Sequence, residues 1–342
     1  MKRVFVLFST IIICMMASST PRQRLVGNIY YYLNHKERTA QVADFPTNKE
    51  DERIGSYSGD IVIPSYIKVN NKQYRVTSID YGAFSFSQHL YSVTIPPTIQ
   101  KIGKNAFWAC DSLRKVNITD IGAWCAITFY NNPLFYGDLY INDTLVTDLV
   151  IPDTIKAITN YAFRNCLKIQ TVSLPENLQK IGEGTFMGCT SLYSINIPSQ
   201  VKVIEPYAFE RCKKLTEIHI QNISDWCRID YTQSMCGKAF RHSHNLYLNG
   251  ELVTDLVIPE GVEEIKDDAF IWCTSIQTIS IPKSVKKIGK RAFYGCTKVN
   301  EVTIPETVHQ IGDGAFYKIQ YVNYRGIATG SPWGAEYHDT DF

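Results

Sequence analysis

A phenylalanine recurs every 23 residues through most of this 342-residue chain, and this period restricts the folds that the chain can adopt. The phenylalanines that keep the period form three runs: Phe84 and Phe107; Phe163, Phe186 and Phe209; Phe270, Phe293 and Phe316. A unit of this length cannot bury its own apolar face, so each unit must stack on its neighbours in a solenoid. We therefore predict one elongated repeat domain, whose usual product is a long exposed surface and not a catalytic pocket.

The full unit reads IPxxVxxIGxxAFxxCxxLxxV. Its LxxVxIP segment alternates apolar and polar side chains, which predicts a short strand that ends at the proline, because proline has no N–H for the sheet. The VxxIG segment is predicted to cross the opposite face, and AFxxC to form a tight turn or short helix whose phenylalanine stacks into a spine. The predicted core residues are Phe107, Phe163, Phe186, Phe209, Phe270, Phe293, Cys166 and Cys189.

This pattern resembles the BspA-like family of leucine-rich repeats over residues 61–324. Eight AF or TF units carry the resemblance, and in six of them a cysteine follows three residues later: Cys110, Cys166, Cys189, Cys212, Cys273 and Cys296. The first and last units depart from it, with Ser87 and Ile319 at that position, as capping repeats commonly do. The resemblance implies a mostly β leucine-rich-repeat slab with short turns or helices and with N- and C-terminal caps. It also implies an exported protein that adheres to a host matrix protein such as fibronectin or fibrinogen, or to other cells.

A second, longer repeat overlies the first. Its copies are IGAWC at 121–125 with LYINDTLVTDLVIP at 139–152, and ISDWC at 223–227 with LYLNGELVTDLVIP at 246–259. The dipeptides ND and NG in these strings suit a two-residue hairpin turn. We predict hairpin modules near 121–152 and 223–259, each with one tryptophan, Trp124 or Trp226. We call each turn of the stack a rung. These tryptophans either fill wider rungs or create relief on the surface.

The ends of the chain lack the repeat. Residues 1–19 resemble a signal peptide, in which two basic residues precede an apolar stretch, 4–16, that is too short to span a bilayer comfortably. Isoleucine precedes Cys14 where a lipoprotein signal would have a small residue, so we do not expect a lipid anchor. The prediction is a secreted or cell-surface protein with no membrane span.

Two further segments are expected to cap the repeats. Residues 20–60 form the predicted N-terminal cap, with strands at 29–33 and 39–42 that cover the first edge of the stack. Residues 325–342 form a C-terminal tail or cap, in which Trp333 is expected to fold back onto the last rung.

The ten cysteines do not predict a disulfide framework. Cysteines in phase with the repeat point in parallel, which does not suit a disulfide, so we predict a ladder of buried thiols. Cys227 and Cys236 lie close enough in sequence to pair, and the sequence leaves this open. Cys236, His242 and His244 resemble metal ligands but have no fourth candidate nearby, so we predict neither metal nor cofactor.

Charge and motifs exclude several classes of function. The net charge is +2, from 35 basic and 33 acidic residues, and no long run of like charge predicts binding to nucleic acid or to an anionic membrane. The sequence has no GxSxG, HExxH or GxxxxGK[ST] motif, and a glycan-directed enzyme would need paired carboxylates across a cleft. We therefore expect no enzymatic activity.

The exposed side of the predicted strands is the candidate binding surface. It carries small polar residues, and we assign the candidate binding residues Tyr91, Arg114, Tyr193 and His219 to it, together with the hairpin modules. The expected partner is a protein or glycan ligand, possibly a host matrix protein. Alternatively, this surface is a solvated sheet face that binds no ligand. The alternative function is a structural cell-envelope scaffold that assembles with itself or with another exported protein.

Overall fold

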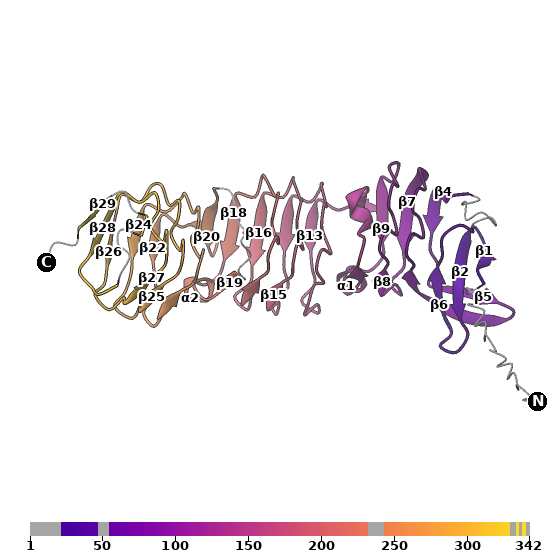
Figure 1. Cartoon of the computed structure of the whole chain (residues 1–342), viewed down its shortest axis with the longest axis horizontal. Coiled ribbons are helices and arrows are strands. Elements are labelled where there is room, and N and C mark those ends of the chain that lie inside the picture. The colour runs from indigo at the N-terminus through magenta and orange to yellow at the C-terminus, as the bar shows by residue number, and fades with distance from the viewer. Residues whose placement is uncertain (1–21, 47–54, 232–242, 329–332, 335–336, 340–342) are drawn as a thin grey trace, which may run out of the picture.

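The chain folds into an elongated, mostly β solenoid of about ten turns, which confirms the predicted fold class (Figure 1). The computed structural model describes residues 22–46, 55–231, 243–328, 333–334 and 337–339. The predicted signal peptide, residues 1–19, lies outside the described residues. The N-terminal and C-terminal regions lie at opposite ends of the long axis.

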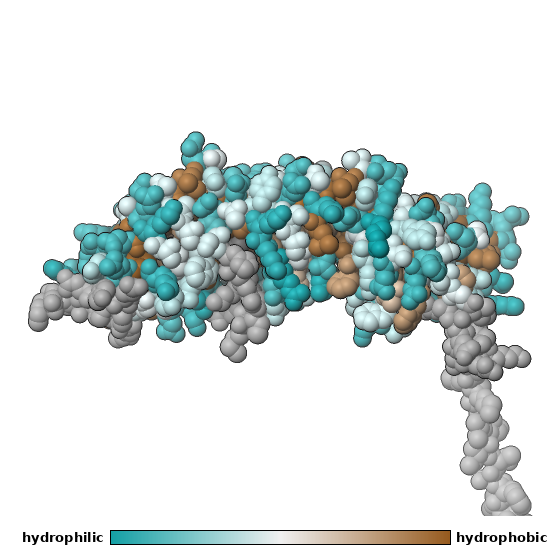
Figure 2. All heavy atoms as spheres, turned by 90° about the horizontal axis from the view of Figure 1, so that it is seen from above, coloured by the Kyte–Doolittle hydropathy of each residue, from teal (hydrophilic) through white to brown (hydrophobic). Residues whose placement is uncertain are grey.

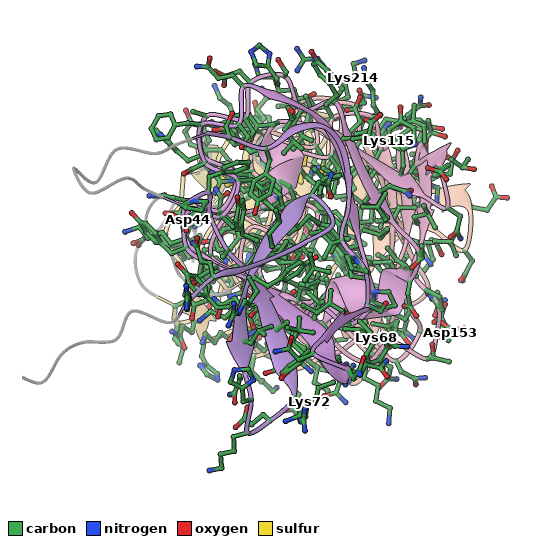
Figure 3. The ribbon with its side chains drawn as sticks, turned by 90° about the vertical axis from the view of Figure 1, so that its right-hand side faces the viewer. Asp44, Lys68, Lys72, Lys115, Asp153 and Lys214 are labelled. Carbon is green, nitrogen blue, oxygen red and sulfur yellow. The ribbon has the colours of Figure 1, made fainter. Side chains whose placement is uncertain are left out.

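An antiparallel meander covers the first edge of the stack. Its strands are β1 (Arg24–Val26), β2 (Ile29–Asn34) and β3 (Thr39–Val42). The last of them pairs in parallel with β6 (Lys72–Ile79), which also forms a hairpin with β5 (Tyr66–Val69). In the end-on view of Figure 3, Lys72 projects from the end of this hairpin, away from the stack. The two strands expected at 29–33 and 39–42 are therefore present and cover the edge of the repeats.

The LxxVxIP segments, together with the LYI and LYL segments of the hairpin modules, form parallel strands along one face of the solenoid, which we call the sheet face. These strands are β4 (Ser58–Val62), β7 (His89–Ile95), β9 (Lys115–Ile118), β11 (Asp138–Ile141), β13 (Asp148–Val150), β14 (Thr171–Ser173), β16 (Ser194–Ile197), β18 (Glu217–Ile220), β20 (Asn245–Leu248), β22 (Asp255–Val257), β24 (Thr278–Ser280), β26 (Glu301–Ile304) and β28 (Tyr321–Tyr324). Alternate residues are buried, as in β26, where Val302 and Ile304 point into the core.

The VxxIG segments, together with the TF and DY segments of the hairpin modules, form two-residue strands on the opposite face. They are β8 (Lys101–Ile102), β10 (Thr128–Phe129), β15 (Lys180–Ile181), β17 (Val203–Ile204), β19 (Asp230–Tyr231), β23 (Glu264–Ile265), β25 (Lys287–Ile288) and β27 (Gln310–Ile311). A glycine follows β8, β15, β25 and β27, and it allows close approach of the preceding rung. A Cβ on Gly289 would lie 2.4 Å from the backbone nitrogen of Asp267, which explains why this position excludes other residues.

The phenylalanines stack into the predicted spine. The Phe163 and Phe186 rings are 5.6 Å apart at 8°, and the Phe186 and Phe209 rings are 5.6 Å apart at 5°. All of the predicted core residues are buried, at 0–3 % exposure: Phe107, Phe163, Phe186, Phe209, Phe270, Phe293, Cys166 and Cys189. Because successive rings stack within each run of phenylalanines, the spine links the rungs of a run directly.

A ladder of thiols runs beside the spine. The Sγ of Cys189 donates to the carbonyl oxygen of Phe163 at 3.1 Å, and the Sγ of Cys212 donates to that of Phe186 at 3.0 Å. The described cysteines are free and buried, which confirms the predicted thiol ladder. Cys227 is among these free thiols, and Cys236 lies outside the described residues.

Each hairpin module buries one tryptophan in the core. Trp124 lies on α1 (Ile121–Cys125) and Trp226 on α2 (Ile223–Trp226), and both are at most 2 % exposed. Their indole Nε1 groups donate to the carbonyl oxygens of Ala162 and Ala269, at 2.9 and 2.7 Å. In a regular rung the equivalent oxygen accepts a backbone N–H, as Ala208 accepts that of Phe186. The interpretation that these tryptophans fill wider rungs is therefore correct.

Two β-hairpins divide the sheet face. After η1 (Pro133–Phe135), β11 turns through Asn142 and Asp143 into β12 (Thr144–Leu145), and β20 likewise turns into β21 (Glu251–Leu252). Each return strand ends a sheet, and the next sheets begin at β13 and β22. We therefore distinguish a first segment (β4–β12), a second segment (β13–β21) and a third segment (β22–β29).

The C-terminal region closes the last rung. Strand β29 (Tyr337–Asp339) pairs in parallel with β28. Trp333 is 4 % exposed, its ring lies 5.3 Å from that of Tyr324, and its carbonyl oxygen accepts the backbone N–H of Phe316. Trp333 thus folds back onto the last rung, as expected.

The spine predicts a large effect of one substitution in the middle of the stack. Phe186→Ala should lower the free energy of unfolding by about 3–5 kcal/mol, because it opens a cavity between two stacked rings. Urea unfolding followed by circular dichroism measures this loss. The control is Phe135→Ala, at a ring that is 59 % exposed, which should cost less than about 1 kcal/mol. Equal losses for the two variants would contradict the role of the spine.

The buried thiols predict a loss of stability in alkali. Burial raises the pKa of Cys125, Cys227 and Cys296 from 9.0 to about 12. The folded protein therefore holds these protons more tightly than the unfolded chain does. The resulting stabilisation is complete below pH 9 and is lost as the pH rises from 9 toward 12.

Each such thiol should steepen the fall in unfolding free energy by about 1.4 kcal/mol per pH unit within this window. Urea unfolding at several pH values, with Cys296→Ala beside the unaltered protein, isolates the effect of one thiol from that of other titrating groups. The variant should show the shallower pH dependence, and identical slopes would refute the assignment.

Candidate functional site

The sheet face aligns its outward side chains in rows, because neighbouring strands are paired in register. In the second segment the central row contains Val150, Ser173, Asn196, His219 and Tyr247. Such a row offers a ligand one side chain per rung at the spacing of a parallel sheet, about 4.8 Å. The candidate residues can therefore be placed by rung and by row.

Tyr91 and Arg114 lie on neighbouring rungs of the first segment. The backbone N–H of Arg114 donates to the carbonyl oxygen of Tyr91 at 2.9 Å, and the Tyr91 side chain is 53 % exposed. The Arg114 guanidinium donates through Nη1 to the carbonyl oxygens of Asp111 and Leu113, at 2.7 and 3.1 Å. These bonds hold the guanidinium against its own turn, on the exposed surface beside the start of the strand.

Tyr193 and His219 lie on neighbouring rungs of the second segment. Tyr193 is 40 % exposed at the start of β16. The His219 ring stacks on Tyr247, with the ring centroids 4.6 Å apart at 17°, and its Nε2 lies 3.6 Å from Oε2 of Glu217. This stack restrains the imidazole and leaves it only partly accessible.

The structure brings the four candidates together as two pairs, not as one site. Tyr91 and Arg114 belong to the sheet that ends at β12, whereas Tyr193 and His219 belong to the sheet that begins at β13. Asn117, at the outward position of β9, is only 5 % exposed, because its Oδ1 accepts the backbone N–H of Asp143 in the hairpin turn. It therefore supports the hairpin and is not available to a ligand.

An aromatic edge on the first segment, formed by Phe86, Trp108 and Phe135, was not predicted from the sequence. These side chains are 58, 54 and 59 % exposed, and the backbone N–H of Phe86 donates to the carbonyl oxygen of Trp108 at 2.7 Å. For Phe86 and Trp108, the signal in the sequence is their place just after the spine residues Phe84 and Phe107. At the position of Trp108 the second segment has Arg164, Met187 and Glu210.

Exposed aromatic residues are concentrated in this segment. Those between residues 55 and 136 are Tyr66, Tyr81, Phe86, Tyr91, Trp108, Tyr130 and Phe135, whereas the rest of the described chain contributes Tyr193, Tyr317 and Tyr321. In the view of Figure 2 the surface is mostly hydrophilic or neutral, with hydrophobic residues in separate patches. The three segments thus differ in the surface that they offer, although their cores repeat.

A carboxylate is fixed at the start of the second and third segments. Asp148 accepts hydrogen bonds from the hydroxyls of Thr171 and Thr147, and Asp255 accepts them from Thr278 and Thr254. The bond from the next rung is 2.6 Å in both cases. These hydrogen bonds lower the pKa of both carboxyl groups, and the bond from the threonine of the next rung has the larger effect. Both carboxylates therefore remain negatively charged in mild acid.

The described residues hold no group of three or more histidine, cysteine or acidic side chains that could bind a metal ion. Of the predicted Cys236, His242 and His244 cluster, only His244 is described. It is buried, and its Nε2 lies 3.3 Å from the Sγ of Cys273. That contact gives the first thiol of the third segment a partner in place of a spine carbonyl.

Comparison with known proteins agrees with this architecture. The family model for the BspA type leucine-rich repeat region, described with six copies, matches residues 65–136, 135–246 and 242–327. The chain belongs to the BspA-type leucine-rich repeat family. No curated protein matches it.

Several solved structures resemble this BspA-type chain. A leucine-rich cell surface protein from Faecalibacterium prausnitzii is 23 % identical, with 90 % of this chain and 89 % of that chain covered and a TM-score of 0.47. A leucine-rich repeat protein from Bacteroides ovatus is 21 % identical, with 90 % of each chain covered and a TM-score of 0.42. The pneumococcal vaccine antigen PcpA is 16 % identical, with 89 % of this chain and 82 % of that chain covered and a TM-score of 0.36.

Within the described part of this BspA-type chain, no helix has the length and apolar character needed to cross a lipid bilayer.

Proposed function

We propose that this protein is a non-enzymatic extracellular binding protein, which attaches to a host matrix protein or to another cell-surface ligand. Membership of the BspA-type leucine-rich repeat family supports a role in protein interaction. The basic and apolar residues at 1–19 support export to the cell surface or the medium.

The observation that carries the proposal is the concentration of exposed aromatic side chains on the first segment. Tyrosine, tryptophan and arginine dominate the energetics of protein interfaces, because they bury large areas and also form hydrogen bonds. Tyr91 and Arg114 lie on the rungs of β7 and β9, and Phe86 and Trp108 lie in the turns of the same two rungs. The binding surface that we propose therefore combines the start of these strands with the aromatic edge.

Tyr193 and His219 form a second, smaller part of the proposed surface. They lie about four strand positions further along the stack than Arg114, on the order of 20 Å at the usual strand spacing. Only a ligand with an extended interface could contact both pairs. Matrix proteins built from many modules can present an interface of that length.

The test is a titration of the full chain over immobilised fibronectin and fibrinogen. Tyr91→Ala with Arg114→Ala should weaken binding about tenfold or more, because interface residues of this kind commonly contribute ~1.4 kcal/mol or more. Tyr193→Ala with His219→Ala should weaken it less. The melting temperature should not change in either double variant, because the replaced side chains are exposed or partly exposed.

Two results would count against the proposal. Unchanged binding in both double variants would place the site elsewhere on the molecule. The absence of saturable binding to both proteins would remove the assignment to these matrix ligands, and ordered oligomers in light scattering would then favour the envelope scaffold.

A further inference from the structure

A groove of about 410 Å³ lies where the second segment meets the third. Its walls include Leu248, Glu251, Leu252, Asp255 and Val257, which come from the hairpin β20–β21 and from β22. It exists because the hairpin interrupts the stacking of one rung on the next.

Two sheet edges border this groove. Strand β21 pairs antiparallel with β20, through Tyr247 with Leu252 and Leu248 with Glu251, and it is the last strand of its sheet. Strand β22 pairs with β24 and is the first strand of the next sheet. Within the described residues no sheet pairing joins β21 to β22. A sheet edge presents backbone donors and acceptors to which another extended chain can pair.

The side chains at these edges are apolar, unlike those in the regular rungs. Leu252 is 44 % exposed and Val257 is 62 % exposed. Regular strands have Ser173 or Asn196 at the position that corresponds to Val257. Natural proteins usually protect exposed edges with charged residues or proline, so exposed aliphatic side chains beside two edges indicate a surface that a partner covers.

The charge of the groove is negative. Glu251 and Asp255 both line it, and none of the described residues that line it is basic or aromatic. Asp255 is fixed in place by the hydroxyls of Thr278 and Thr254, at 2.6 and 3.0 Å. A basic side chain of a partner would therefore meet a carboxylate whose position is already set, which lowers the cost of ordering it.

We propose that this groove binds an extended segment of a partner polypeptide as an added β-strand, with an apolar side chain against Leu252 and Val257 and a lysine or arginine beside Glu251 and Asp255. The residues of this groove differ from Tyr91, Arg114, Tyr193 and His219, and the proposal does not depend on those four residues. A polypeptide fits better than a glycan, because aliphatic walls lack the aromatic rings on which sugars stack, and sheet edges match the repeat of a peptide backbone.

The first junction supplies an internal control. The same string, LVTDLVIP, occurs at 145–152 and at 252–259, and Leu145 and Val150 are 36 and 66 % exposed. Thr144 replaces Glu251 at the first junction, and the acidic residue beside it, Asp143, is paired with Lys115 at 2.7 Å. That junction therefore has the apolar pair but no carboxylate at the position of Glu251. Val150 is thus matched to Val257 in sequence and exposure but differs in its surroundings.

The test uses the full chain and a fluorescein-labelled peptide, acetyl-KVTVTVK-amide, in fluorescence anisotropy titrations. Saturable binding is expected, and Val257→Thr should weaken it about tenfold by replacing a methyl contact with a hydroxyl. Val150→Thr should change it by less than about twofold if the carboxylate pair is required. Leu252→Asn gives a second variant on the opposite wall. The melting temperature of each variant checks that it remains folded.

Charge and backbone pairing are tested separately. Glu251→Gln with Asp255→Asn should weaken binding and flatten its dependence on salt. The peptide EVTVTVE, and a KVTVTVK peptide with N-methylated backbone at alternate residues, should both bind at least about tenfold more weakly.

The proposal is overturned if the KVTVTVK peptide does not bind saturably, or if Val257→Thr and Val150→Thr have equal effects. Equal binding of the N-methylated peptide would overturn strand addition. Binding of cellohexaose that is lost in Val257→Thr, with no binding of the peptide, would identify a glycan site instead. Because the matrix-protein titration uses different variants, either proposal can fail while the other stands.

Discussion

One carbonyl group, that of the spine phenylalanine, ties its own turn to the thiol of the next rung. The oxygen of Phe163 accepts the backbone N–H of Cys166 in its own rung at 3.2 Å and the thiol of Cys189 in the next rung at 3.1 Å. A buried carbonyl without a partner would destabilise the fold, and a hydroxyl would be a more polar group to bury at the same place. Cysteine combines a small apolar side chain with a weak donor, which explains why it recurs with the spine.

The hairpin modules interrupt this arrangement and compensate for the interruption locally. The indole of Trp226 satisfies the oxygen of Ala269, which a backbone N–H of the preceding rung would otherwise reach, so the core remains continuous through α2. The sheet face has no such compensation, because β21 turns back and does not add a parallel strand for β22. The core therefore runs the length of the molecule, whereas the sheet face is divided.

The periodic part of the structure and the repeated hairpin modules could be predicted from the sequence, but particular side-chain contacts outside the 23-residue period could not. Strands 23 residues apart pair in register, as Ile195 does with Val172, because the same buried positions recur. His219 instead stacks on Tyr247, which lies in a module outside the period, so no repeat alignment pairs them. The exposure of Phe86 depends on a turn in which its φ is 57°, and a pattern of apolar residues does not specify that conformation.

The division of the sheet face gives the molecule two physically different kinds of surface. Tyr91 and Trp108 offer side-chain area on rungs that are fully paired with their neighbours, so recognition there depends on shape and on aromatic contacts. At Val257 the sheet itself is unfinished, so recognition there can use backbone groups and tolerate different partner sequences. A stacked core fixes the distance between the two surfaces. A ligand that contacts both would gain affinity only if its own binding segments span that distance, which makes spacing itself a basis for selectivity.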